Sequence, residues 1–345
     1  MARRRPVSSR PDPRRFAALR LATLARTPGF LGGARAAGQL AAMWARGERL
    51  GLEHHHRDDL QALWFHDPET WFGGPATLLF LDRDPRSDEA LTRLLAIVRA
   101  HLDALDETTW LEVDARDLPL VHGLVTLGFH LESVVQVGDP RVALDALLAR
   151  HAPAAALAGS PASPGLVARL DPLGLELAPA GPGDVDAIIA LHREAFTAQP
   201  EYCFFGALPG HLTRMRAHIL SLVARPGAPP EHWIVREAGT GVGGVVGHLE
   251  TEIEEDHPFW GCHAGLGFVL VPHLRGRGIV KTLYHVALAA AIARGARLVK
   301  GGSAQPAVLG LGRLMRRPWH TIALRRVPAF DPEHFLRFHP ERQDY

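Results

Sequence analysis

The hydrophobic and polar positions of the chain form two blocks in which strand patterns alternate with helix patterns. In the first block, short apolar runs predict strands, and a 3.6-residue repeat over residues 88–105 predicts an amphipathic helix. Its predicted elements are a strand at 76–81, the helix at 88–105, a strand at 109–113, a helix at 118–127 and a strand at 129–137. This alternation predicts an α/β fold.

The second block repeats the pattern closer to the C-terminus. Asp184 is the predicted N-cap of a helix through Ile188, and Gly295 the predicted end of a helix that starts near Ile279. The other predicted elements are strands at 175–177, 233–236, 244–254, 266–271, 298–300 and 321–325 and a helix that begins at Pro306.

A segment rich in Ala, Pro, Gly and Ser separates the two blocks. Its four prolines exclude a continuous helix or strand, which is typical of a linker. A chain of 345 residues is also long enough for two cores. The predicted domains are a basic, partly ordered lead-in at 1–46, a first domain at 47–150, a linker at 151–173, a second domain at 174–330 and a tail at 331–345.

Composition narrows the possible functions. The 38 Lys and Arg residues balance 37 Asp and Glu residues, which argues against a general affinity for nucleic acid or anionic membranes. Cys203 and Cys262 lack the spacing of a zinc or redox site, so we expect no metal and a reducing, cytoplasmic location. No apolar run approaches the ~20 residues that cross a bilayer. Neighbouring residues point in different directions, so the run His54 to His56 is interpreted as a solvated loop.

The candidate chemistry lies between residues 268 and 283, where a strand, a short loop with two glycines and a helix start follow one another. The first amides of a helix have no partner within it and carry partial positive charge, so they can bind an anion. Gly276 and Gly278 lack a Cβ and allow close approach of phosphate oxygens, while Arg275 and Arg277 add charge. Lys281 stands where a Rossmann motif has its third glycine, and a Walker Gly-Lys-Ser/Thr is absent.

The stretch Val-Pro-His-Leu-Arg-Gly-Arg-Gly-Ile at 271–279 resembles the central motif of GCN5-related N-acetyltransferases (GNATs), Gln/Arg-x-x-Gly-x-Gly/Ala, although His273 stands where the family has Gln or Arg. The order of elements from 175 to 325 resembles that fold too. The resemblance implies two tandem GNAT-like domains, each with a mixed, mostly antiparallel sheet flanked by helices. It also implies acyl-CoA, most simply acetyl-CoA, as co-substrate.

In that family, the strand before the loop pairs with the pantetheine amides and the next strand diverges from it. Acyl group and acceptor would then meet near residues 301–303. The implied CoA-binding residues are Phe268, Val269, Leu270, Val271, His273, Leu274, Arg275, Gly276, Arg277, Gly278, Ile279, Val280 and Ser303.

The first block also resembles half of a GNAT domain, through the stretch 117–129 that ends in Leu-Gly-Phe. Between Leu81 and Leu91, however, it has no glycine pair, and its four acidic residues would repel a diphosphate. We therefore expect a degenerate partner domain that builds the core or shapes the acceptor site.

An amine acceptor must lose a proton before it attacks a thioester, so a base is needed near the loop. Strand alternation puts His248, Glu250, Glu252 and Glu254 on one face, opposite Leu249 and Ile253. The candidate bases are Glu250, then Glu252, then His263; the alternative is that these are solvated positions on an exposed face. The tyrosine that many members use as acid would fall on Gly312.

The sequence therefore predicts an N-acyltransferase in which the amine of a small molecule, peptide or protein attacks acyl-CoA directly in a ternary complex. Three alternatives stay open: transfer of longer acyl chains, a catalytically silent CoA-binding or scaffolding protein, and an RNA or membrane tether through Arg3 to Arg20. The oligomeric state and the acceptor are not fixed by the sequence.

Overall fold

The computed structural model describes residues 12–26, 29–68, 75–104, 108–150, 168–170, 173–198, 209–225, 230–240, 244–303 and 319–326. These residues form two compact units, neither of which is continuous in sequence. Unit 1 takes residues 1–70, 74–132 and 320–345, and unit 2 takes 71–73 and 133–319.

Unit 1 is a mixed sheet with helices on it. Its strands lie in the order β1-β2-β3-β4-β12, with β3 and β4 parallel and the other neighbouring pairs antiparallel. The strands are β1 (Glu53–His56), β2 (Leu60–Asp67), β3 (Ala76–Arg83), β4 (Thr109–Asp114) and β12 (Trp319–Arg326). The helices are α1 (Pro13–Leu24), α2 (Gly33–Arg49), α3 (Asp88–Leu102) and α4 (Leu118–Thr126).

The core of unit 1 follows from the apolar spacing of its helices. Leu94 and Val98 of α3 repeat at four residues and pack, fully buried, with residues of β2, β3 and β4. Within the segment predicted as a partly ordered lead-in, Phe16 of α1 and Trp44 of α2 are also buried, with ring centroids 5.4 Å apart. Helices α1 and α2 are therefore part of this unit.

Unit 2 contains the predicted phosphate loop. Its strands lie in the order β5-β11-β10-β9-β8-β7-β6, and β10 and β11 are the parallel pair. The strands are β5 (His130–Gly138, from Ser133 on in unit 2), β6 (Ala168–Leu170), β7 (Leu175–Pro179), β8 (His232–Glu237), β9 (Val245–His257), β10 (Gly261–Leu270) and β11 (Leu298–Ser303). The helices are α5 (Pro140–Arg150), α6 (Val185–Ala198), α7 (Pro209–Val223) and α8 (Ile279–Ala293).

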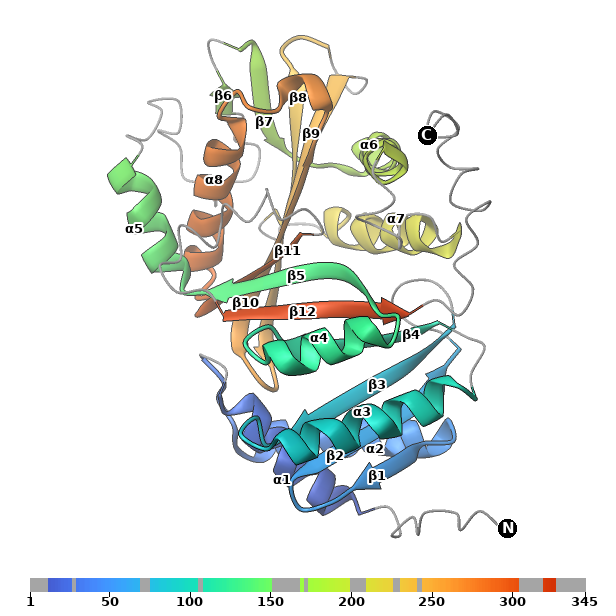
Figure 1. The fold of residues 1–345 in the computed structure, drawn as a ribbon. Coiled ribbons are helices and arrows are strands. Elements are labelled where there is room, and N and C mark those ends of the chain that lie inside the picture. Colours follow the sequence, from blue (N-terminus) through green and yellow to red (C-terminus); the bar gives the residue numbers. More distant parts are fainter. Residues whose placement is uncertain are drawn as a thin grey trace, which may run out of the picture. The chain divides into compact units, whose positions relative to one another are not determined.

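Helices cover both faces of the unit 2 sheet (Figure 1). Helices α8 and α5 pack on the face that carries Leu249, Ala264 and Leu266. Helices α6 and α7 cover the opposite face around Ile234. Both units thus have a mixed, mostly antiparallel sheet flanked by helices, which confirms the predicted fold class.

The compact units divide the chain at other points than the predicted domain limits 47–150 and 174–330. Strand β5 pairs antiparallel with β11 of unit 2 over 134–138, and β12 pairs antiparallel with β4 of unit 1 over 321–326. Helix α5 packs its buried Leu147 into the core of unit 2. Each half of the sequence therefore supplies a strand to the unit formed mainly by the other half.

Two local predictions need correction. The run His54 to His56 is the strand β1, paired with β2, and His54 is buried, with its ring 3.4 Å from the side-chain oxygen of Gln61. Asp184 directly precedes α6, but its carboxylate accepts hydrogen bonds from the Gly181 amide and from Arg236 instead of capping that helix. It therefore ties the entry of α6 to β8.

Candidate active site

Strands β10 and β11 part in the middle of unit 2. They pair from His263 to Leu266, where Leu266 faces Gly301, while β10 stays paired with β9 as far as Leu270. On its other side β11 continues to Ser303 in register with β5. Within the described residues, no strand takes the place of β11 beside residues 267–270. The backbone of Phe268, Val269 and Leu270 therefore borders a gap between two parallel strands.

Helix α8 begins next to this gap. Its N-cap, Gly278, has φ 83°, and its first turn holds no acidic residue. As far as the structure describes the chain, no side chain caps the helix. The amide of Lys281 donates to the carbonyl of Gly278 at 3.0 Å, so the positive end of the helix dipole and the amides that precede Lys281 are what this turn offers to a ligand.

The backbone conformation of the two loop glycines adds a second reason for glycine to the close approach of phosphate expected from the sequence. Gly276 has φ 77° and Gly278 φ 83°, in the left-handed region that other residues rarely adopt. A Cβ built on either glycine would meet no atom within 4 Å. The turn therefore needs glycine for its backbone conformation, and open space lies on the Cβ side of both residues.

The other loop residues divide into buried and exposed positions. Leu274 and Ile279 are buried and anchor the loop in the core, with Val271 and Val280 packed against the same cluster. Arg275 donates from Nε to the carbonyl of Leu270 at 3.3 Å, so its side chain folds back onto the end of β10. The exposed loop residues are Pro272, His273, Arg275, Gly276, Arg277 and Gly278.

Glu250 lies at the point where the strands part. It is the register partner of Gly267, the first residue of β10 beyond its pairing with β11. A Cβ at Gly267 would stand 2.7 Å from Oε1 of Glu250 and 3.0 Å from Cδ. The carboxylate therefore lies directly over the backbone of Gly267, which is possible only because that residue has no side chain.

The surroundings of Glu250 favour its protonated form. Burial raises the pKa of this carboxyl from 4.5 to about 8, and the negative charge of Glu252 adds to the rise. Such a pKa lies near neutral pH, where a general base exchanges protons most effectively. Glu250 is half-buried, and its role as a base stays a prediction beside the alternative of a solvated position.

Glu252 lies two residues further along the same face of β9. Its Oε1 is 2.7 Å from Nε2 of His218 on α7 and 3.7 Å from Nε2 of His232 on β8. The Glu252 side chain keeps 37% of its exposure, whereas that of His232 is fully buried. Glu250 thus leans towards β10, and Glu252 towards β8 and α7.

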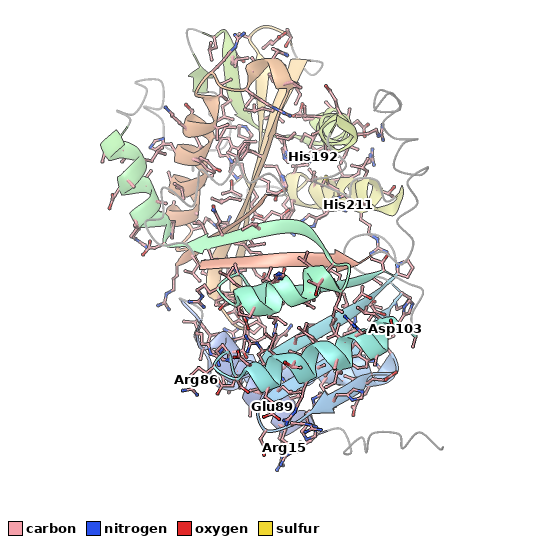
Figure 2. All side chains as sticks on the ribbon, in the orientation of Figure 1. Arg15, Arg86, Glu89, Asp103, His192 and His211 are labelled. Carbon is pink, nitrogen blue, oxygen red and sulfur yellow. The ribbon has the colours of Figure 1, made fainter. Side chains whose placement is uncertain are left out.

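Three histidines, His192, His232 and His248, contact one another near these carboxylates and are called the histidine row. His192 of α6 (Figure 2) meets His248 of β9 with Nε2 and Nδ1 2.9 Å apart, and His248 meets His232 with Nε2 and Nδ1 3.0 Å apart. The His232 and His248 rings are stacked, with centroids 5.2 Å apart. Burial lowers the pKa of His192 and of His232 to about 4 and holds that of His248 well below its usual value, so the rings are neutral at neutral pH.

His263, the third candidate base, lies apart from this group. It stands on the paired part of β10, four residues and so about 13 Å from Gly267. Its Nε2 is 3.9 Å from Glu254, and burial lowers the pKa of its ring. The structure therefore brings Glu250 and Glu252 together near the gap, but not His263.

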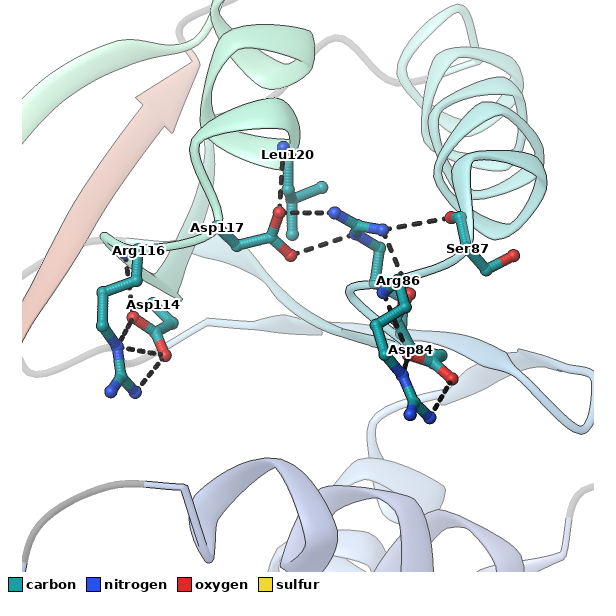
Figure 3. Close-up of polar contacts among 8 residues, drawn as sticks. Asp84, Arg86, Ser87, Asp114, Arg116, Asp117 and Leu120 are labelled. Atoms are coloured by element: carbon teal, nitrogen blue, oxygen red, sulfur yellow. Dashed lines mark hydrogen bonds and ion pairs between the residues drawn. The ribbon is translucent and has the colours of Figure 1, made fainter.

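Unit 1 has the same strand, helix and parallel strand, with a different turn between them. Arg83 at the end of β3 binds Asp117 through Nε and Nη2 at 3.0 and 2.5 Å, and its Nη1 donates to the carbonyls of Asp84 and Ser87. Ser87 also caps α3 through the amide of Ala90 at 3.0 Å. Figure 3 shows Asp117 and Ser87 at the starts of α4 and α3. In this turn, groups of the chain itself therefore bind the guanidinium of Arg83 and cap the N-terminus of α3.

Comparison with solved structures places the fold. The GCN5-related N-acetyltransferase of Sphaerobacter thermophilus matches over 92% of this chain and 93% of its own, with 15% identity and a TM-score of 0.52. A GNAT-family acetyltransferase of Colwellia psychrerythraea (92% and 98%, 11% identity, TM-score 0.47) and one of Kribbella flavida (92% and 97%, 14% identity, TM-score 0.41) also match. No family model matches the sequence, and the search of curated proteins finds no significant relative.

The first of these matches shows that the chain has the fold of the GCN5-related N-acetyltransferases. The resemblance seen in the sequence is thereby confirmed at the level of the fold. That both units are copies of this fold stays a prediction, as does the cytoplasmic location.

Several predictions about the site lie partly outside the described residues. Gly312, where the acid was sought, and Cys203 fall among the undescribed positions, and of Ser303 only the backbone is described. Over the part of the chain that is described, no group of three or more His, Cys, Asp or Glu residues could hold a metal ion. In that same part, no helix is both long and apolar enough to cross a membrane.

The histidine row and His218 were not predicted from the sequence. These residues come from α6, α7, β8 and β9, and nothing in their local spacing connects them. The only local signal was the alternation that put His248 on the face of Glu250 and Glu252.

Proposed function

We propose that unit 2 is an acyl-CoA-dependent N-acyltransferase, most simply of the acetyl group, which acts on an amine of a small molecule, peptide or protein. The observation that carries the proposal is the coincidence of three features within a few residues. The parallel strands part at Gly267, Glu250 lies over that residue, and the uncapped start of α8 follows.

The loop and the strand edge would hold the co-substrate. The amides at the start of α8 suit the diphosphate, with Arg277 as an exposed cation beside them. The open side of Gly276 and Gly278 leaves space for phosphate oxygens. The backbone of Phe268 to Leu270, along the gap, can pair with the amides of the pantetheine arm. An acyl group at the end of that arm would lie near Gly267 and Glu250.

Glu250 would act as the general base. It takes one proton from the ammonium form of the acceptor, whose nitrogen then forms a bond to the acyl carbon while the carbon–sulfur bond of the thioester breaks. The nitrogen gives up its second proton to the departing thiolate, so that CoA leaves as the free thiol. Because a thiolate is a good leaving group, the step does not depend on a separate acid.

The loop glycines allow a matched test of CoA binding. Gly276→Ala places a Cβ in the space beside the loop, and Gly295→Ala, at φ 78° beyond the other end of α8, introduces the same backbone strain away from it. We expect both to lower stability by about 1 kcal/mol. Only Gly276→Ala should also weaken the protection of the protein by CoA against thermal unfolding, by about tenfold in CoA concentration.

Turnover is measured as thiol release from acetyl-CoA over a panel of amines that includes diamines, amino sugars and lysine peptides. Protection by CoA without thiol release would favour the alternative of a catalytically silent CoA-binding protein over an enzyme. Release only from longer acyl-CoAs would favour long-chain transfer. No protection of the wild-type protein by CoA would refute the proposal.

A further inference from the structure

Two imidazole nitrogens converge on one carboxylate oxygen. His218 from α7 and His232 from β8 direct their Nε2 atoms at Oε1 of Glu252, at 2.7 and 3.7 Å. An exposed glutamate would normally rotate freely into water, because ordering its side chain costs entropy. The hydrogen bond to His218 instead holds its charge on this face of the sheet, two residues from Glu250. Nε2 of His232, which is buried and has no hydrogen-bond partner among the described residues, faces the same oxygen at 3.7 Å.

The buried row fixes which nitrogen of His232 carries hydrogen. Each ring-to-ring bond contains one hydrogen, so the tautomer of one ring determines that of the next. A carboxylate near Nε2 of His232 favours hydrogen on that nitrogen, which makes Nδ1 the acceptor for Nε2–H of His248. His248 Nδ1 is then the acceptor for Nε2–H of His192. With these tautomers, the Nε2–H of His232 at the end of the row points towards Glu252.

We propose that Glu252 is a positioning residue that keeps a negative charge beside Glu250, and that His218 and the histidine row hold it in that position. The inference rests on the proposed role of Glu250 as base. A neighbouring negative charge makes Glu250 a stronger base, better matched to the proton of an ammonium group. Glu252 acts through Glu250 and does not itself need to contact the acceptor.

Other groups on this face do not take the place of Glu252. Glu254 lies further along β9, is exposed and faces His263, and the nearby rings are neutral or paired. The titratable groups on this face of the sheet and on the helices that cover it include His192 on α6, His211 (Figure 2) and His218 on α7, His232 on β8, His248, Glu252 and Glu254 on β9, and His263 on β10; of these, Glu252 is the one whose charge acts on the pKa of Glu250.

The test follows the carboxyl titration of Glu250 directly, by carbon NMR of full-length protein labelled at the glutamate side-chain carboxyl carbons, with Glu250→Gln to assign the signal. Glu252→Gln removes the neighbouring charge. Glu254→Gln removes an equal charge from the same face of the same strand. His218→Ala removes the contact to Glu252, whereas His218→Gln retains a donor near the position of Nε2.

We expect Glu252→Gln to lower the titration midpoint of Glu250 by about one pH unit or more, which is tenfold more carboxylate near pH 6.5. His218→Ala should lower the midpoint in the same direction, and Glu254→Gln and His218→Gln should leave it unchanged. The pH profile of thiol release should shift in parallel. Unchanged midpoints in both Glu252→Gln and His218→Ala would overturn the inference.

This titration separates the inference from the proposed function. It needs neither CoA nor an acceptor, so it gives an answer even if no amine is acylated, and CoA protection of each variant shows whether the loop is intact. Nitrogen NMR of the imidazoles tests the row itself, with hydrogen expected on Nε2 of all three rings. Hydrogen on Nδ1 of His232 would remove the row from the proposal.

Discussion

The position of the Glu250 carboxylate depends on a residue that has no side chain. Glu250 and Gly267 are partners across β9 and β10, and the carboxylate occupies the volume in which a Cβ of residue 267 would stand. Gly265, on the same face of β10, has a different neighbourhood: its Cβ would meet only the backbone and Cβ of Glu252, at 3.8 and 4.0 Å. The two glycines therefore have different reasons to be glycine.

This difference gives a prediction for a matched pair of variants. Gly267→Ala must displace the Glu250 carboxylate, since the new Cβ would lie 2.7 Å from Oε1. A displacement of about 1 Å at a catalytic group costs about 10²-fold in rate. We expect that loss in thiol release for Gly267→Ala, with CoA protection retained, and at most a small effect for Gly265→Ala. Equal effects of the two substitutions would contradict this account of Glu250.

At the scale of single residues, the sequence predicted the strand face on which a side chain lies better than the residues that the side chain contacts. Alternation along β9 correctly placed Glu250 and Glu252 opposite Leu249, because period 2 is a local property of a strand. It could not show that Gly267 lies beneath Glu250, since this depends on the register between two strands. Nor could it connect His192, His232 and His248, which tertiary packing brings together from three elements.

The elements of unit 2 are joined by buried polar groups with opposite responses to pH. The rings of His192, His232 and His248 have lowered pKa values because of burial, and the carboxyl of Glu250 has a raised one. When pH falls below 6.5, the histidines of the unfolded chain take up protons while the buried rings of the folded chain stay neutral. The free energy of unfolding therefore decreases as the pH approaches 4. Glu250 behaves in the opposite way: its stabilising contribution is complete below 4.5 and is lost as pH rises through about 8.

We therefore expect the free energy of unfolding of unit 2 to be highest near pH 6.5. Each group changes it by at most about 1.4 kcal/mol per pH unit, and three histidines outweigh one carboxyl on the acid side. Hydrogen exchange of β8 and β9 across pH 4.5 to 9 measures this. Glu250→Gln should remove the decline above pH 6.5 and His248→Gln should reduce the decline below it. A flat curve for the wild-type protein would contradict the burial of these groups.

Most elements were visible in the sequence, and the exceptions have physical reasons. Helix α8 begins at the predicted Ile279 and ends at Ala293, just before the predicted stop at Gly295, because its apolar repeat and its flanking glycines agree. Strand β1 was missed because its histidines look polar although His54 bonds Gln61 within the unit. Strand β10 begins five residues earlier than predicted, at Gly261, because the less apolar residues 261–265 pair with both neighbouring strands.

At the scale of the whole molecule, the exchange of β5 and β12 decides how the chain can be divided. No local pattern indicates this exchange, because the strands that pair lie far apart in the sequence. The predicted limits 47–150 and 174–330 would separate β5 from β11 and β12 from β4. Strands left without these partners expose unpaired amides and carbonyls at a sheet edge.

We expect fragments 1–150 and 174–345 to be poorly folded when each is produced alone. Hydrogen exchange should show the loss at β4 in the first fragment and at β11 in the second. Production of both fragments together should restore this protection. Cleavage of the folded full-length chain between residues 151 and 167 should leave the protection intact. Full protection of β4 in the isolated first fragment would contradict the need for β12.

The late arrival of β12 has a consequence during translation. Strand β4 ends at Asp114, and the strand that covers its edge ends only at Arg326. At a typical elongation rate of about 5 to 20 residues per second, the nascent chain exposes that edge for roughly 10 to 40 s before its partner leaves the ribosome. During this interval the first unit is an incomplete sheet, and a chaperone that shields strand edges would act on it then.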